Sequence, residues 1–157
     1  EGQVEWNATD INPEDKALGT RDVPFSRALY IERDDFMIDA PADYYRLSVG
    51  REVRLKNAYI VRCTGYETDA EGLVTTVTCE YLPETKTGQA NAKHKVKGTI
   101  HYVSTSHCLD AEVRLYDRLL TVANPAEEKD RDFMDMLNPD SLTVNNRSYR
   151  RTSASRQ

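Results

Sequence analysis

The chain has 157 residues, of which 39% are hydrophobic and 30% charged, and its formal net charge is −5. These values are typical of a globular protein with one ordinary domain or two small ones, and they exclude a disordered chain. No run approaches the ~20 apolar residues that a membrane-spanning helix needs, and the first residues do not resemble a secretion signal. Because the chain begins at Glu1 rather than Met, we expect a fragment of a longer protein.

The three cysteines are Cys63, Cys79 and Cys108, an odd number at wide spacing. No CxxC pair is present, so the pattern favours neither a zinc site nor a disulfide framework. We therefore expect three reduced structural thiols in a cytoplasmic protein.

In chain order, the first elements are predicted to be short and β-rich. Residues 1–22 are polar and predict a loop, and the β-branched and aromatic run 28–31 predicts a strand. Residues 34–38 could form one helical turn. Over residues 53–63, apolar and basic side chains alternate, which predicts a strand with its positive charge on one face.

The second half continues in the same style. Residues 73–81 and 96–103 predict two more strands, and 112–120 fits either a strand or a helix. Residues 132–137 predict a short helix, and 142–144 predict a last strand. Short strands without a repeated strand–helix alternation predict a mainly β fold, an antiparallel β-barrel with small helical additions.

No sequence motif points to catalysis. The chain has no Gly-rich phosphate loop, no HExxH or GxSxG, and no nucleophile–base signature. His101, His107 and Cys108 lack the spacing of metal ligands, so we predict structural or surface roles for them. If the parent protein is an enzyme, its active site lies outside this chain.

One segment has a charge opposite to its surroundings. Residues 1–45 carry eleven acids and four bases, whereas residues 46–62 carry five bases and one acid. The bases are Arg46, Arg51, Arg54, Lys56 and Arg62, and Tyr44 and Tyr45 precede them. Arginine can bind a base edge or a phosphate and tyrosine can stack on an unpaired base, so the segment could bind one particular RNA. A solvated outer strand face explains the same spacing.

Five blocks in order along residues 19–144 make the sequence recognisable. They are RDVPFS with YIERDDF (21–26 and 30–36), YRL with GREVRLKNAY (45–47 and 50–59), KVKGTIHYVS (95–104), EVRLYDRL (112–119) and NPDSL (138–142). Together they strongly resemble the anticodon-binding region of glutaminyl-tRNA synthetases. The catalytic domain of that family, with its nucleotide-binding motifs, has no counterpart here.

The resemblance implies two β-barrel modules, similar in fold to a ribosomal protein that binds 5S RNA. Residues 1–103 would form the first barrel and residues 104–144 the start of an incomplete second barrel. Residues 145–157 match nothing in the family, and their polar, basic composition predicts a disordered tail.

The resemblance also implies which residues face the anticodon. They are Arg46, Arg54 and Lys56, with weaker candidates in Tyr45 and Asn57. Tyr45 replaces a lysine expected in some relatives, which would exchange a phosphate contact for a stacking surface.

The function implied is recognition of the anticodon loop of glutamine tRNA by the non-catalytic part of a cytoplasmic, monomeric glutamine–tRNA ligase. The fragment itself would hold no cofactor or metal, the intact enzyme would use ATP, and neither DNA nor a membrane would be a partner. Three alternatives stay open: a glutamate–tRNA ligase of the archaeal or eukaryotic kind, a stand-alone RNA-binding barrel, or a degenerate fragment without binding activity.

Overall fold

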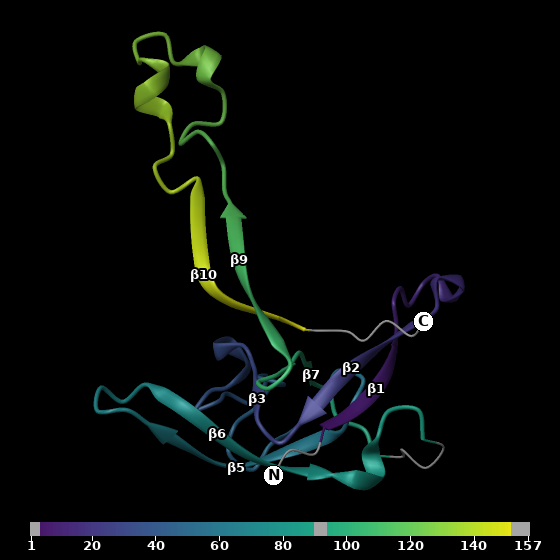
Figure 1. Ribbon diagram of the computed structural model, residues 1–157. Coiled ribbons are helices and arrows are strands. Elements are labelled where there is room, and N and C mark those ends of the chain that lie inside the picture. Colours follow the sequence, from purple (N-terminus) through teal and green to yellow (C-terminus); the bar gives the residue numbers. More distant parts are fainter. Residues whose placement is uncertain (1–3, 90–93, 152–157) are drawn as a thin grey trace. The chain divides into compact units, whose positions relative to one another are not determined.

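The computed structural model describes residues 4–89 and 94–151, with side chains up to residue 145 (Figure 1). Residues 152–157 of the predicted tail lie outside the described residues. The chain forms two compact units: the first extends to Cys108, and the second is Leu109–Arg150. In the described part of the chain, no helix is long and apolar enough to cross a membrane.

The first unit contains eight strands and three single-turn 3₁₀ helices among its described residues. These are β1 (Val4–Asp10), η1 (Lys16–Leu18), β2 (Thr20–Ser26), β3 (Leu29–Tyr30), η2 (Arg33–Asp35), β4 (Glu52–Leu55), β5 (Ile60–Thr68), β6 (Val74–Leu82), η3 (Pro83–Thr85), β7 (Thr99–Ile100) and β8 (Val103–Ser104). Strand order in the largest sheet is β6-β5-β4-β7, while β1 pairs with β2 and β3 with β8.

The prediction of a loop over residues 1–22 is wrong, because β1 and β2 form an antiparallel ribbon in which Asn7 is opposite Val23. The buried position on β1 is polar, since Asn7 is buried while Trp6 is 42% exposed. This arrangement inverts the usual pattern of apolar residues inside, so periodicity did not reveal the strand. Only the connection is a loop, and it closes where the Ile11 amide donates to the Gly19 carbonyl at 3.1 Å.

The core of the first unit lies against one face of the four-stranded sheet. It consists of Val23, Leu47, Val53, Leu55, Ala58, Tyr59, Val61, Cys63, Ile100 and Tyr102. Phe25 on β2 packs over this cluster, with its ring centroid 5.3 Å from that of Tyr59 and 5.8 Å from that of Tyr102. The aromatic contacts therefore fix the β1–β2 ribbon on the sheet.

The second unit is a two-stranded ribbon, β9 (Cys108–Tyr116) with β10 (Leu142–Arg151), closed by a long loop that holds η4 (Pro125–Glu127) and η5 (Phe133–Met136) (Figure 1). Residues 112–120, ambiguous in the sequence, are strand up to Tyr116. The prediction of a disordered tail from residue 145 needs correction, since β10 continues to Arg151. Pairing with β9 provides the backbone hydrogen bonds that a polar segment needs to remain a strand.

The prediction of a mainly β fold with small helical additions is confirmed. The prediction of an antiparallel β-barrel is confirmed only in part. The described strands belong to four separate sheets, and these do not join into one closed barrel. One pair departs from the antiparallel prediction, because β4 runs parallel to β7, with Arg54 beside Thr99. The predicted strand 96–103 is in fact two short strands, β7 and β8.

Candidate nucleic-acid interface

The basic segment lies on a tight hairpin rather than on one strand. β4 and β5 are antiparallel, with Arg54 opposite Ile60, and the Ala58 amide donates to the Leu55 carbonyl at 2.9 Å to close the turn. Asn57 has a φ of 62°, a left-handed conformation that asparagine tolerates better than most residues. The prediction of a single strand over 53–63 is therefore wrong, and Asn57 has a conformational role in the turn.

Arg54 on β4 holds the loop that follows β6. Its Nη1 donates to the Thr85 carbonyl at 2.9 Å and to the Thr87 hydroxyl at 3.2 Å, with a longer contact to the Ala58 carbonyl at 3.5 Å. No other described residue accepts from its Nε or Nη2. One part of the guanidinium is thus used by the fold, and the remaining donors can reach a ligand.

Lys56 is exposed at the turn, directly after β4. Its backbone amide donates to the Ile100 carbonyl at 3.0 Å, which continues the ladder between β4 and β7. Among residues 4–89 and 94–145, its ammonium group has no hydrogen-bond or ion-pair partner. Its charge is therefore available to solvent or to an anionic ligand.

Arg46 forms an ion pair with a buried carboxylate. Its Nη1 lies 2.7 Å from Oδ1 of Asp35, whose side chain is 6% exposed, while the Arg46 side chain is 49% exposed. Burial raises the pKa of Asp35, and the charge of Arg46 opposes that rise. The pair fixes the orientation of Arg46 and leaves the outer part of its guanidinium in water.

Tyr45 has an exposed ring, half of its surface being accessible, and Lys97 lies over that ring at 4.7 Å from the centroid. A Cβ added to Gly98 would lie 1.6 Å from the Tyr45 carbonyl oxygen. Only glycine fits here, and it lets the backbone at Tyr45 approach the segment before β7. Since Gly98 also accepts a hydrogen bond from the Arg54 amide at 3.0 Å, Tyr45 and Lys97 lie beside β4.

Two further arginines of the basic segment serve the fold. Arg62 donates twice to Oε1 of Glu52, at 2.9 and 2.5 Å, and His94 lies 2.6 Å from the other carboxylate oxygen. Hydrogen bonding by Arg62 is the first cause of a lowered Glu52 pKa. Arg51 donates to three carbonyls in the loop 40–44, at 2.5, 2.9 and 3.0 Å.

The structure therefore brings Tyr45, Arg54, Lys56 and Asn57 to the neighbourhood of β4 and β7, and directs one donor of Arg46 to a buried aspartate. Lys97 belongs to the same neighbourhood, although it is not among the residues that the resemblance implied. Its position 52 residues after Tyr45 hid the contact, and no local pattern could have shown it. Among the described residues, no group of three His, Cys, Asp or Glu could hold a metal ion.

The comparisons with known proteins define the class of this chain. Residues 1–82 match the family model described as "tRNA synthetases class I (E and Q), anti-codon binding domain", and residues 99–155 match a second model of the same description. The chain belongs to this family of anticodon-binding domains, which confirms the resemblance noted in the sequence. The expectation that residues 145–157 match nothing in the family is wrong, because the second match extends to residue 155.

Three similar curated proteins are all of one kind within this family. The chain is 51% identical over 145 residues to a glutamine–tRNA ligase of Rhodopirellula baltica, covering 92% of the chain and 24% of that protein. It is 49% identical over 145 residues to one of Cupriavidus necator, covering 92% and 25%, and 52% identical over 141 residues to one of Bordetella avium, covering 89% and 24%. The chain spans about a quarter of the length of the curated relatives it matches.

Proposed function

We propose that this chain binds the anticodon loop of glutamine tRNA, as the non-catalytic part of a glutamine–tRNA ligase. Family membership carries the proposal, because both matched family models describe anticodon-binding domains and the similar proteins are glutamine–tRNA ligases. Those relatives favour glutamine over the glutamate alternative, and their greater length favours a ligase over a stand-alone barrel.

The binding surface consists of Tyr45, Arg46, Arg54, Lys56 and Asn57. Lys56 is a mobile point charge suited to a phosphate, whereas the half-exposed ring of Tyr45 offers a flat surface on which an unpaired base can stack. The unused donors of Arg54 and Arg46 can bind base edges, and their protein contacts reduce the entropy lost on binding. Asn57 allows the tight turn between β4 and β5, beside Arg54 and Lys56.

The intact ligase would use ATP to join glutamine to its tRNA, with the ATP bound outside this chain. We place the protein in the cytoplasm, as a monomer that binds neither DNA nor a membrane. The division into a first β-barrel over 1–103 and the start of a second over 104–144 stays a prediction.

The test is a binding titration of the full chain against three transcripts: glutamine tRNA, the same tRNA with a swapped anticodon, and glutamate tRNA. We expect Arg54→Lys to weaken binding of glutamine tRNA by about 1–3 kcal/mol and to affect the anticodon-swapped tRNA less. Lysine retains a donor for the Thr85 carbonyl but loses the planar fork, so the loop stays held. We expect Arg46→Ala to act in the same direction.

Lys56→Ala has a different expected signature. Removal of a phosphate contact should weaken the binding of all three RNAs to a similar degree. It should also lower the salt dependence of binding by about one counterion. Lys16→Ala is the matched control, because Lys16 is an exposed lysine of the first unit on η1, far along the chain from this surface. If Arg54→Lys and Arg46→Ala weaken binding of all three RNAs equally, these arginines contact phosphates and do not bind base edges.

If the chain binds glutamate tRNA more tightly than glutamine tRNA, the proposed RNA is glutamate tRNA instead.

A further inference from the structure

Two of the three cysteines are direct neighbours across β5 and β6. In the antiparallel register, Cys63 is opposite Cys79, next to the pair of Arg62 and Glu80, and the register shifts directly after Cys63. Cross-strand partners project from the same face of a sheet, so both thiols lie on the side of the core. Neither residue belongs to the proposed RNA-binding surface, and all three cysteines are free thiols in the structure.

The backbone pairing of Cys63 with Cys79 is compatible with a disulfide. The Cys63 amide donates to the Arg51 carbonyl at 3.0 Å, and the Cys63 carbonyl accepts from the Gly50 amide at 2.9 Å. Both backbone groups of Cys63 therefore point away from β6, which makes its pair with Cys79 a non-hydrogen-bonded one. In such pairs the Cα atoms are about 4.5 Å apart and the side chains are closest. Native disulfides span Cα separations of about 4.4–6.8 Å.

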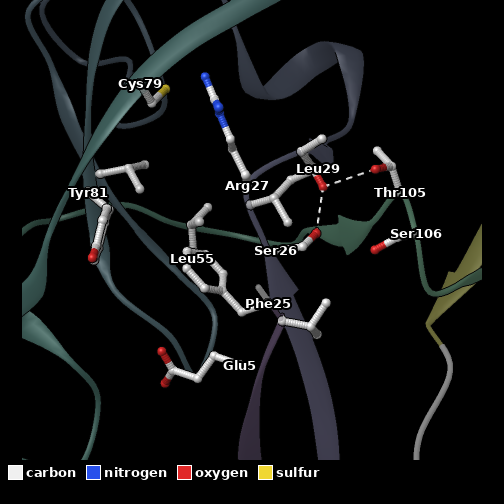
Figure 2. A pocket seen from close by; sticks show the side chains of 13 residues that line it. Glu5, Phe25, Ser26, Arg27, Leu29, Leu55, Cys79, Tyr81, Thr105 and Ser106 are labelled. Carbon is white, nitrogen blue, oxygen red and sulfur yellow. Dashed lines mark hydrogen bonds between the residues drawn. The ribbon is translucent and has the colours of Figure 1, made fainter. Parts of the chain in front are cut away.

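The two cysteines differ in their exposure. Cys63 is 1% exposed and belongs to the core, whereas Cys79 lines a groove of about 600 Å³ together with Tyr81 and Arg27 (Figure 2). The two thiols also interact with each other. A small oxidant can therefore approach Cys79 from the groove before it reaches Cys63, and the sulfur of Cys63 lies beside that of Cys79.

Burial affects the rate of such a reaction. Although Cys79 as a residue is exposed, burial of its thiol and the neighbouring Cys63 raise the pKa of Cys79 to about 12. Burial likewise raises the pKa of Cys63. Thiolates are the reacting species, so both cysteines react slowly at neutral pH and faster as the pH rises.

We propose that Cys63 and Cys79 form an oxidisable site, a dithiol that closes to a cross-strand disulfide with a low-molecular-mass disulfide such as oxidised glutathione. Cys79 loses its proton to solvent and its sulfur attacks the glutathione disulfide, whose S–S bond breaks and releases one glutathione thiolate. The deprotonated sulfur of Cys63 then attacks the mixed disulfide at Cys79 and releases the second. Two protein thiols are oxidised, one small disulfide is reduced, and the two protons pass to the glutathione thiolates.

The experiment incubates the full chain in glutathione buffers of increasing potential at mildly alkaline pH, blocks free thiols, and measures intact mass and peptide linkage. The wild type and Cys108→Ser should each lose two hydrogens, with Cys63 and Cys79 in one linked peptide. Cys108→Ser is the matched control because its thiol donates only to the Thr105 carbonyl. Oxidation should raise Tm, because a crosslink restricts the unfolded chain, and dithiothreitol should reverse the rise.

Two single variants complete the test. Cys79→Ser changes an exposed residue and should fold normally while forming no internal disulfide, and Cys63→Ala should give at most a mixed disulfide at Cys79. The proposal is overturned if folded wild type keeps three free thiols in the most oxidising buffer while the urea-unfolded chain oxidises. The proposal is also overturned if Cys108 forms a disulfide with Cys63 or Cys79 as readily as those two form one with each other.

Discussion

The two units are made of similar strands but bury their apolar side chains to different degrees. In the first unit, Leu47 and Val53 are almost fully buried, and the ring of Phe25 on β2 packs against the same core. In the second unit, Leu115 is 59% exposed and Met134 is 68% exposed, and among its described residues only Met136 is a buried apolar residue. Two units of one family thus differ in what stabilises them.

Backbone hydrogen bonds take the place of a core in the second unit. The Thr121 amide donates to the Met136 carbonyl at 2.9 Å, and the Asn138 amide donates to the Leu119 carbonyl at 2.8 Å. Such bonds each contribute only about 1 kcal/mol net, whereas a buried leucine contributes several times more on truncation. We therefore expect the first unit to be sensitive to single core substitutions and the second to open locally.

The largest expected effect is that of Leu47→Ala. Leu47 is 2% exposed and packs in the core of the first unit, so its truncation should cost about 2–5 kcal/mol of unfolding free energy. Urea denaturation measures the loss. Leu115→Ala in the second unit is the matched control and should change stability by no more than about 0.5 kcal/mol. Similar losses for both variants would contradict the contrast between the units.

Met136→Ala should cost about 2 kcal/mol, and only locally. Met136 is 3% exposed, and its carbonyl also accepts the Thr121 hydroxyl at 3.2 Å. We expect faster amide hydrogen exchange in residues 117–138, with no change in the β4–β5 hairpin, because few buried contacts oppose opening of this loop. Met134→Ala, at an exposed position two residues away, is the control. Faster exchange throughout the first unit would show that the two units unfold together.

The smallest expected effect, about 1 kcal/mol, is that of Glu52→Gln at neutral pH. Hydrogen bonds from Arg62 lower the pKa of Glu52, so the charged carboxylate stabilises the fold above the ordinary pKa of about 4.5. That contribution is lost as the pH falls through the lowered pKa. The difference between wild type and variant, measured by urea denaturation from pH 7 to pH 2.5, should vanish at the acidic end. If the difference in unfolding free energy grows as the pH falls, the charged form of Glu52 does not stabilise the fold.

Some of the structure could be read from local pattern. The Thr and Val residues that dominate 73–81 predict a strand, which the structure shows as β6, because a pleated surface favours β-branched side chains. The short helix near residue 133 and the last strand were also predictable from their flanking proline and apolar residues. The anticodon-binding family was recognisable because its blocks stand in order along the chain.

The reversal between β4 and β5 could not be read in this way. Odd-numbered residues such as Val53 and Val61 face the core both before and after the turn, because the register pairs these two directly. A turn that preserves this parity leaves the alternation unbroken, so a hairpin and a single strand give the same pattern. The left-handed Asn57 is the one local sign, and asparagine occurs in many other settings.

By itself, the sequence determined that this chain is β-rich, carries a basic segment in an acidic protein, and belongs among anticodon-binding domains. Only the tertiary structure decided which of its basic side chains are used by the fold and which face water. Arg46 is paired with an aspartate and Arg54 with loop carbonyls, whereas Lys56 has no partner among the described residues. The reason is physical: a side chain's partners come from segments distant in sequence, and alternation along one strand carries no information about them.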